Sequence, residues 1–226
     1  MSRAQRTDVP TCRDRRESTN VRRMEILVPS GRMVRWVANF EERHGSTALA
    51  VTAGALTGTA EDVSTFAARL PFDAGYDGPA DPARLAAAAR PPADWGVLLV
   101  RKGGFAIARL HGTTVSASKT GQRHVQGRTK AGGQSQQRFA RRRDNQARQA
   151  YEAAADHAAR ILAGLRGPVV VGGDRTAVDE VLADRRLGHL VTTGPWLAVP
   201  DPRRGVLEQA VADAGAVRVD VHNAEK

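Results

Sequence analysis

The chain has 226 residues, of which 41% are hydrophobic and 26% charged, and its formal net charge is +10. This length and apolar content are enough for one good core or two small ones. Cys12 is the single cysteine, which excludes an intramolecular disulfide and a cysteine-based zinc site. No apolar run approaches the roughly 20 residues that cross a bilayer, and the Arg-rich start lacks the apolar segment of a secretory signal. We therefore expect a cytoplasmic protein with no membrane partner.

The first part of the chain predicts a tail followed by a small folded portion. Residues 1–23 are polar and rich in arginine, which predicts a disordered basic tail. Residues 24–94 are expected to form a smaller N-terminal α/β portion and a linker. The expected elements are a strand over 25–28, a helix from Pro29-Ser30 to about Arg43, a strand over 48–52 and a short helix around 84–89.

The second part, residues 95–226, begins with a predicted meander of three antiparallel strands over 96–102, 105–110 and 113–119. A long helix is then expected from Ser135 to the Gly167-Pro168 pair. Its apolar stripe has helical spacing and consists of Phe139, Ala147, Ala150, Ala154, Ala158, Ile161 and Leu165. Strands over 169–171, 190–192 and 217–221 alternate with helices over 175–186 and 204–214. This order indicates an α/β sheet of mixed strand direction.

The positive charge is concentrated in one segment. Residues 101–150 contain twelve Lys and Arg side chains and one acidic side chain, Asp144, whereas residues 24–100 and 151–226 are each slightly acidic. A solvated surface normally mixes both signs of charge, so this concentration favours a polyphosphate partner such as nucleic acid. A plain solubilising segment is the alternative.

The tripeptide Gly132-Gly133-Gln134 lies in the middle of this basic segment. The cations expected to bind RNA flank it on both sides and are Arg123, Arg128, Lys130, Arg138, Arg141, Arg142 and Arg143. Glycines let the backbone approach a bulky ligand closely. An amide is not a general base, but it can orient a water molecule and donate a hydrogen bond to a developing oxyanion. The tripeptide alone is a weak motif, and an exposed loop with an inert glutamine is the alternative.

The run from Gly132 to Arg141, with the preceding meander and the following helix, resembles the central domain of the eukaryotic and archaeal class I peptide-chain release factors. The resemblance covers about residues 95–222 and implies a ribonuclease H-like release-factor domain with a GGQ loop over residues 95–226. The layout also resembles compact actinobacterial release-factor-like peptidyl-tRNA hydrolases, which are relatives of the release factor of ribosome-associated quality control. We expect neither a codon-reading domain nor a GTPase-binding domain in these 226 residues.

This resemblance implies codon-independent hydrolysis of peptidyl-tRNA at the peptidyl-transferase centre of the large ribosomal subunit. Gly132 and Gly133 would then approach the terminal adenosine, and Gln134 would place a water at the ester carbonyl. The implied partners are rRNA of the large subunit and peptidyl-tRNA; the protein would be a monomer that needs no cofactor or metal and binds no DNA.

Three alternatives remain open at the level of sequence. The protein could be a non-catalytic ribosome- or RNA-binding factor that occupies the tRNA site. Asp174, Asp179 and Asp184 raise the possibility of a metal-dependent nuclease, although a spacing of five residues on a helix scatters the last two. The segment from Val171 to Thr176 could bind phosphate at a helix N-terminus or form an ordinary turn.

Overall fold

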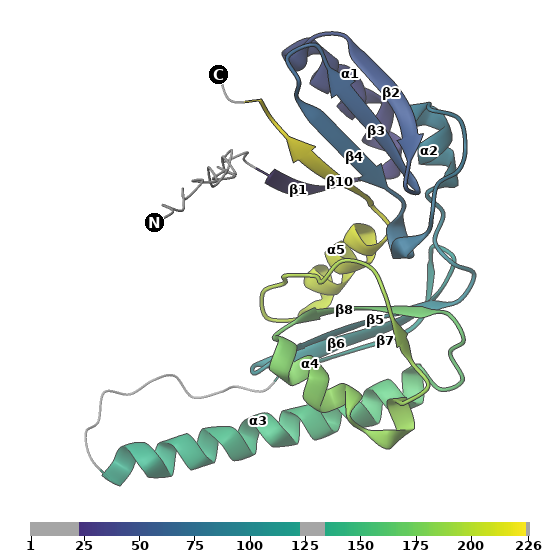
Figure 1. The fold of residues 1–226 in the computed structure, drawn as a ribbon. Helices are drawn as coiled ribbons and strands as arrows, with labels where there is room; N and C mark the ends of the chain where they lie inside the picture. Colours follow the sequence, from purple (N-terminus) through teal and green to yellow (C-terminus); the bar gives the residue numbers. More distant parts are fainter. Residues whose placement is uncertain (1–22, 123–133, 225–226) are drawn as a thin grey trace, which may run out of the picture.

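The computed structural model describes residues 23–122 and 134–224, and in the helix that begins at Gln134 it describes side chains from Arg148 onward. Within these ranges the protein has two five-stranded sheets and five α-helices (Figure 1). The predicted α/β class is confirmed. The predicted disordered tail lies outside the described residues, apart from the backbone of Arg23, where the first strand begins.

The first sheet is antiparallel and has the strand order β1-β10-β4-β3-β2. Its strands are β1 (Arg23–Val28), β2 (Thr47–Thr52), β3 (Ala55–Ala60), β4 (Thr65–Arg69) and β10 (Val217–His222). The helical segments beside it are η1 (Ser30–Arg32), α1 (Met33–His44), η2 (Pro71–Asp73) and α2 (Pro82–Ala88).

Helix α1 packs on this sheet through one stripe. Met33, Val37 and Phe40 recur at intervals of four and three residues and are buried, as expected for an amphipathic helix. The ring of Phe40 meets that of Phe66 from β4 edge-on, with the centroids 5.1 Å apart. Gly45 ends the helix with φ of 91°, a conformation that glycine adopts without strain.

The second sheet has the order β7-β6-β5-β8-β9 and joins an antiparallel meander to parallel strands. Its strands are β5 (Trp95–Arg101), β6 (Gly104–His111), β7 (Thr114–Gln122), β8 (Pro168–Gly173) and β9 (Val191–Thr192). The helical segments around it are α3 (Gln134–Ile161), α4 (Arg175–Leu182), η3 (Arg185–Leu187) and α5 (Arg204–Ala214). The meander lies where the sequence predicts it. The long helix begins one residue before its predicted start and ends at Ile161, before the Gly167-Pro168 pair at which the sequence predicts its end.

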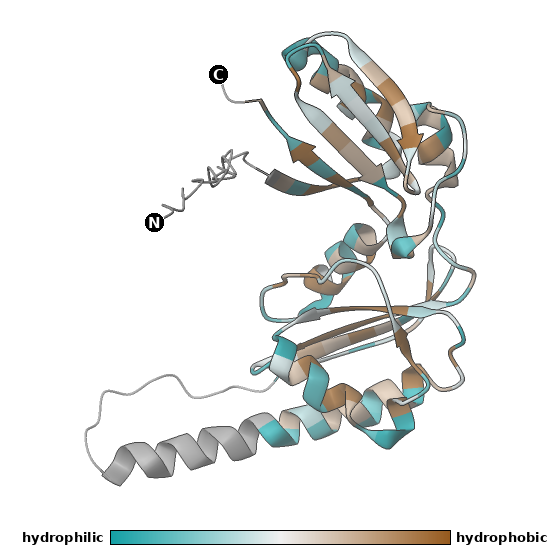
Figure 2. Ribbon diagram, viewed as in Figure 1, coloured by the Kyte–Doolittle hydropathy of each residue, from teal (hydrophilic) through white to brown (hydrophobic). Residues whose placement is uncertain are grey.

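Helices cover both faces of the second sheet, so its central strands are hydrophobic on both sides (Figure 2). In β6, Phe105 and Ile107 join the core under α3 and α4, while Ala106 and Leu110 join the core under α5. This division follows from the alternation of side chains along a strand. It explains why β5 and β6 read as nearly continuous apolar runs.

The last strand differs from the sequence expectation. The pattern of residues 217–221 predicts a closing strand of the second sheet, but β10 lies in the first sheet between β1 and β4. A period of two identifies a strand and does not identify its neighbour. The division into residues 24–94 and 95–226 is therefore a proposal, and in it the second portion contributes one strand, β10, to the sheet of the first portion.

Two strands of the first sheet, β3 and β4, are not predicted from the sequence. Half or nearly half of the residues in each strand are Ala or Gly, which are depleted in strands and hide the weaker signal from threonine. Gly58 in β3 is nevertheless required, because a Cβ at this position would lie 2.2 Å from the ring of Phe66. The aromatic ring thus covers the space that the glycine leaves open.

We predict that removal of residues 216–226 unfolds the first sheet while the second keeps its structure. The deletion takes Val217, Val219 and Val221 out of the core and leaves β1 without its partner. The loss is about 5 kcal/mol or more, at roughly 2 kcal/mol for each buried valine. Amide hydrogen exchange measures it, with a variant that lacks only residues 225–226 as the control. Undiminished protection in β3 and β4 would contradict the prediction.

Candidate functional site

Only one residue of the predicted catalytic tripeptide is described by the structure, and it lies at the start of α3. Gln134 is the first residue of this helix, while Gly132 and Gly133, like Arg123, Arg128 and Lys130, lie outside the described residues. The backbone of the other predicted RNA-binding residues lies in the first turns of α3, and these are Arg138, Arg141, Arg142 and Arg143. All of their side chains lie outside the described set.

The second half of α3 fixes the helix to the sheet. Ala150, Ala154 and Ala158 are buried, as is Leu162 just after the helix, and each exposes 6% of its surface or less. Small alanine side chains allow the helix to lie close to β6. The helix has 28 residues, or about 42 Å at 1.5 Å per residue. Its first half extends beyond the second sheet in Figure 1, so the packed half positions Gln134 from a distance.

The other end of the predicted loop is fixed by a close contact between strands. Gly121 in β7 pairs with Phe105 in β6, and a Cβ on Gly121 would lie 2.4 Å from the phenylalanine ring. The ring of His157 from α3 lies over the same phenylalanine, with the centroids 5.5 Å apart. The sequence analysis does not identify this contact, because nothing in a single strand shows which ring lies above a glycine.

We predict that Gly121→Ala destabilises the protein by about 1–3 kcal/mol, because β7 or Phe105 must shift to admit the methyl group. Urea denaturation measures the change. Gly205→Ala is the matched control, since nothing lies within 4 Å of a Cβ at that position in α5; it should be neutral or slightly stabilising. Equal stability of the two variants would show that β7 has room at this point.

Two cations of the basic segment serve the fold. Both Nε and Nη2 of Arg109 donate to the carboxylate of Asp94, at 3.0 and 2.9 Å, and Nη1 donates to the carbonyl oxygen of Ala163 beyond the end of α3. The Arg109 guanidinium holds the pKa of Asp94 below its usual value. Arg101 donates to the carbonyl oxygen of Val199 at 2.9 Å. These two arginines therefore contribute less to an RNA-binding surface than the sequence charge suggests.

The two glycines of the segment from Val171 to Thr176 are the last residues of β8, and Asp174 joins the strand directly to α4. A Cβ on Gly172 would lie 2.4 Å from the carbonyl oxygen of Leu197, and one on Gly173 would lie 2.1 Å from that of Val100. The N–H groups of Gly173 and Asp174 donate to these same two carbonyl oxygens. Since neighbouring strands already use these donors, the phosphate-binding interpretation loses its main support.

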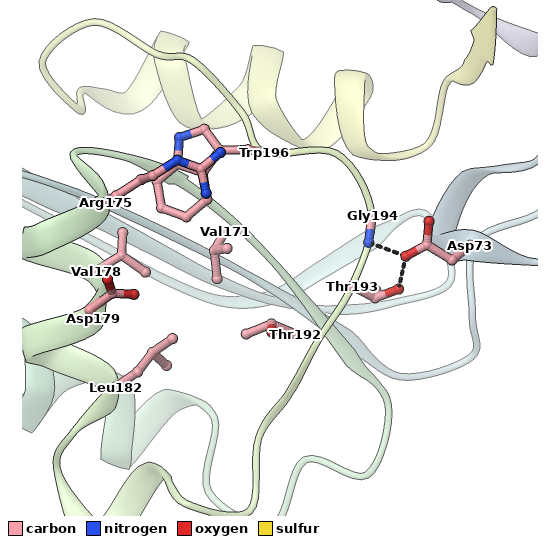
Figure 3. A pocket seen from close by; sticks show the side chains of 10 residues that line it. All are labelled: Asp73, Val171, Arg175, Val178, Asp179, Leu182, Thr192, Thr193, Gly194 and Trp196. Atoms are coloured by element: carbon pink, nitrogen blue, oxygen red, sulfur yellow. Dashed lines mark hydrogen bonds between the residues drawn. The ribbon is translucent and has the colours of Figure 1, made fainter. Parts of the chain in front are cut away.

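A pocket of about 450 Å³ lies between α4 and the segment after β9 (Figure 3). The guanidinium of Arg175 lies 4.4 Å above the ring centroid of Trp196, whose Nε1 donates to the carbonyl oxygen of Gly173. At the other side, one oxygen of Asp73 accepts hydrogen bonds from Thr193 Oγ1 and from the Gly194 N–H, each at 2.8 Å. Asp73 follows β4, so this contact links the two portions of the chain.

The hydrogen bonds from Gly194 and then Thr193 lower the pKa of Asp73, with a smaller contribution from Arg218. Such a carboxylate stabilises the fold above its unfolded pKa, and the effect is lost as the pH falls through the lower folded pKa. We predict that Asp73→Asn costs about 1 kcal/mol at pH 7, a value reduced by the exposure of the side chain. The difference from wild type should shrink as the pH falls below the unfolded pKa of about 4 and through the lower folded pKa. Denaturation at pH 7 and over a series of acidic pH values measures it, and a difference that does not shrink in acid would contradict the prediction.

The aspartates considered for a metal site do not come together. Asp174 lies 3.5 Å from Arg101, and Arg186 lowers the pKa of Asp184 to about 2 through direct hydrogen bonds. Among the described residues, no three His, Cys, Asp or Glu side chains are grouped so that they could hold a metal ion. No helix within the described ranges has the length and hydropathy needed to span a membrane.

Comparison with known protein families identifies the part of the chain that contains α3 as a release factor sequence. Residues 93–220 match the model of the Actinobacteria/chloroflexi VLRF1 release factor, from just before β5 into β10. This match covers more than half of the chain, so the protein belongs to that family, as the sequence resemblance indicates. The family assignment supports a release-factor-like role and interaction with the ribosome. No curated protein matches the chain.

Proposed function

We propose that the protein is a codon-independent peptidyl-tRNA hydrolase that releases stalled nascent chains at the peptidyl-transferase centre of the large ribosomal subunit. The observation that carries the proposal is the position of Gln134, which directly follows two glycines and begins a helix whose other half is buried. A long helix with one anchored half is suited to carrying its first residue into a deep site. Because the proposed reaction takes place on ribosomes, we expect the protein to be cytoplasmic.

The chemistry rests on Gly132, Gly133 and Gln134. As the first residue of α3, Gln134 has a backbone N–H without an acceptor inside the helix. This N–H and the side-chain amide are donors for the oxyanion that forms when water attacks the ester carbonyl. The bond from that carbon to the ribose oxygen then breaks, and the proton lost by the water goes to the ribose oxygen. A ribose hydroxyl assists the transfer, as the resemblance implies, and no metal or cofactor takes part.

The same proposal gives a role to each of the other parts of the chain. Residues 95–226 form a ribonuclease H-like release-factor domain, and residues 24–94 form a smaller portion that supplies most of the first sheet. Arg138, Arg141, Arg142 and Arg143 bind rRNA phosphates, because several guanidinium groups within two turns repel one another unless anions neutralise them. Arg123, Arg128 and Lys130 do the same before the tripeptide. The protein acts as a monomer on rRNA and peptidyl-tRNA.

We predict that Gln134→Ala and Gly133→Ala lower the rate of peptide release from isolated large-subunit–peptidyl-tRNA complexes by about 10²–10³, the usual effect of losing one oxyanion donor or its placement. Gln137→Ala, which removes an amide one turn later in the same helix, is the matched control and should release peptide at the wild-type rate. Wild-type release by all three variants would contradict the mechanism.

The same assay separates the alternatives. A non-catalytic factor that occupies the tRNA site binds the large subunit tightly and releases no peptide even as the wild-type protein. A metal-dependent nuclease cleaves the RNA itself and stops in the presence of a chelator. Release of intact tRNA and free peptide in chelator is the result that we expect.

A further inference from the structure

A small group of basic side chains lies where the packed half of α3 meets the edge strand β7. It consists of Lys119 from β7 with His157 and Arg160 from α3, and we refer to it as the basic seam. Lys119 pairs with Ile107 in the register of β6 and β7, and Gly121 pairs with Phe105, on which His157 lies. The seam therefore lies near the end of β7, since Lys119 is three residues before Gln122, the last residue of the strand.

The side chains of the seam are coupled to one another. Arg160 Nη2 lies 3.0 Å from His157 Nδ1. A guanidinium only donates hydrogen bonds, so His157 accepts at Nδ1 and carries its proton on Nε2. Partial burial, then the charges of Arg160 and Lys119, lower the pKa of His157, and only Asp156 acts in the opposite direction. At neutral pH the seam thus holds two cations and one neutral imidazole N–H donor.

No carboxylate neutralises these two cations within the described part of the chain. Neither Lys119 nor Arg160 belongs to any ion pair there, and both are exposed. The nearest acid in sequence, Asp156, is bound to Arg186 at 2.7 Å. Arg101 and Arg109, in contrast, have carboxylate partners. An uncompensated pair of cations around a neutral donor is suited to an anion with several oxygen atoms, of which phosphate is the commonest.

We propose that the basic seam binds the phosphate backbone of ribosomal RNA, with Lys119 and Arg160 as the phosphate contacts and His157 as an additional donor. The surface around Lys119 has space for an RNA backbone, because the small residues Ala117 and Gly121 flank it on the same side of β7, and within the described residues β7 is an edge strand. The choice of RNA over an acidic protein follows from the concentration of charge in residues 101–150 and from the release factor family. The identity of the RNA rests on the proposed function.

The test is binding of the full-length protein to isolated large ribosomal subunits over a range of salt concentrations. The double variant Lys119→Gln/Arg160→Gln should bind at least tenfold more weakly at moderate salt. The slope of log affinity against log salt should fall by about two, since each lost phosphate contact removes about one. Arg203→Gln/Arg204→Gln is the matched control, because it removes two exposed arginines at α5 on the opposite face of the sheet. It should keep the wild-type slope.

Thermal unfolding of both double variants shows that each is folded before its binding is compared. An unchanged slope and affinity in the seam variant would overturn the proposal, as would an equal loss in the control, which would mean that only total charge matters. These measurements involve no peptide release. If Gln134→Ala released peptide at the wild-type rate, the hydrolase mechanism would therefore be wrong, but the proposal for the basic seam would still stand. An unchanged salt slope in the seam variant would overturn the seam proposal and leave the hydrolase mechanism in place.

A second measurement follows the seam directly. A bound phosphate favours the protonated imidazole, so a short RNA hairpin should raise the NMR titration midpoint of His157. His111, which lies near Asp94 away from the seam, is the internal reference. A midpoint of His157 that does not move when RNA binds would show that the seam is an ordinary solvated surface.

Discussion

The burial of an alanine stripe is the constraint on which the proposed site depends. Ala150, Ala154 and Ala158 bring the second half of α3 against β6. The same helix continues without a break back to Gln134. A long helix is a suitable support for a group that acts far from its own domain, because it can hold that group several turns away from the packed part of the protein.

The connection between the two portions rests on backbone geometry as much as on side chains. Phe72 and Asp73 both have positive φ, at 59° and 53°, which non-glycine residues rarely adopt. This bend turns the Asp73 carboxylate toward Thr193 and Gly194, and it brings the ring of Phe72 to 4.9 Å from that of Trp95 at the start of β5. The strain is local, and the contacts on both sides of it maintain the bend.

Local patterns in the sequence predict the helices and strands of the second portion well. They predict poorly which strands lie side by side. The bounds of α5, residues 204–214, agree with the prediction, and α3 begins one residue from its expected start. In contrast, the sequence does not predict β3 and β4, because the place of Gly58 is explained only by the ring of Phe66 on the neighbouring strand. The contact of Gly121 with Phe105 is likewise a property of two strands. The tripeptide is recognised from its motif, whereas the seam around His157 requires the fold to be known.

The place of β10 also has a consequence for how the protein is made. Arg69 of β4 and Asp220 of β10 form an ion pair although they are 151 residues apart in sequence. The strands of the second sheet and the helix α5 that covers one of its faces all lie between them, so that sheet can assemble during synthesis before β10 is made. The first sheet must wait for the last strand, with β1 unpaired throughout. Its folding is therefore governed by contacts between distant residues, which are the slow ones. A protein of the release factor family thus completes its own first sheet only after β10, Val217–His222, has been made.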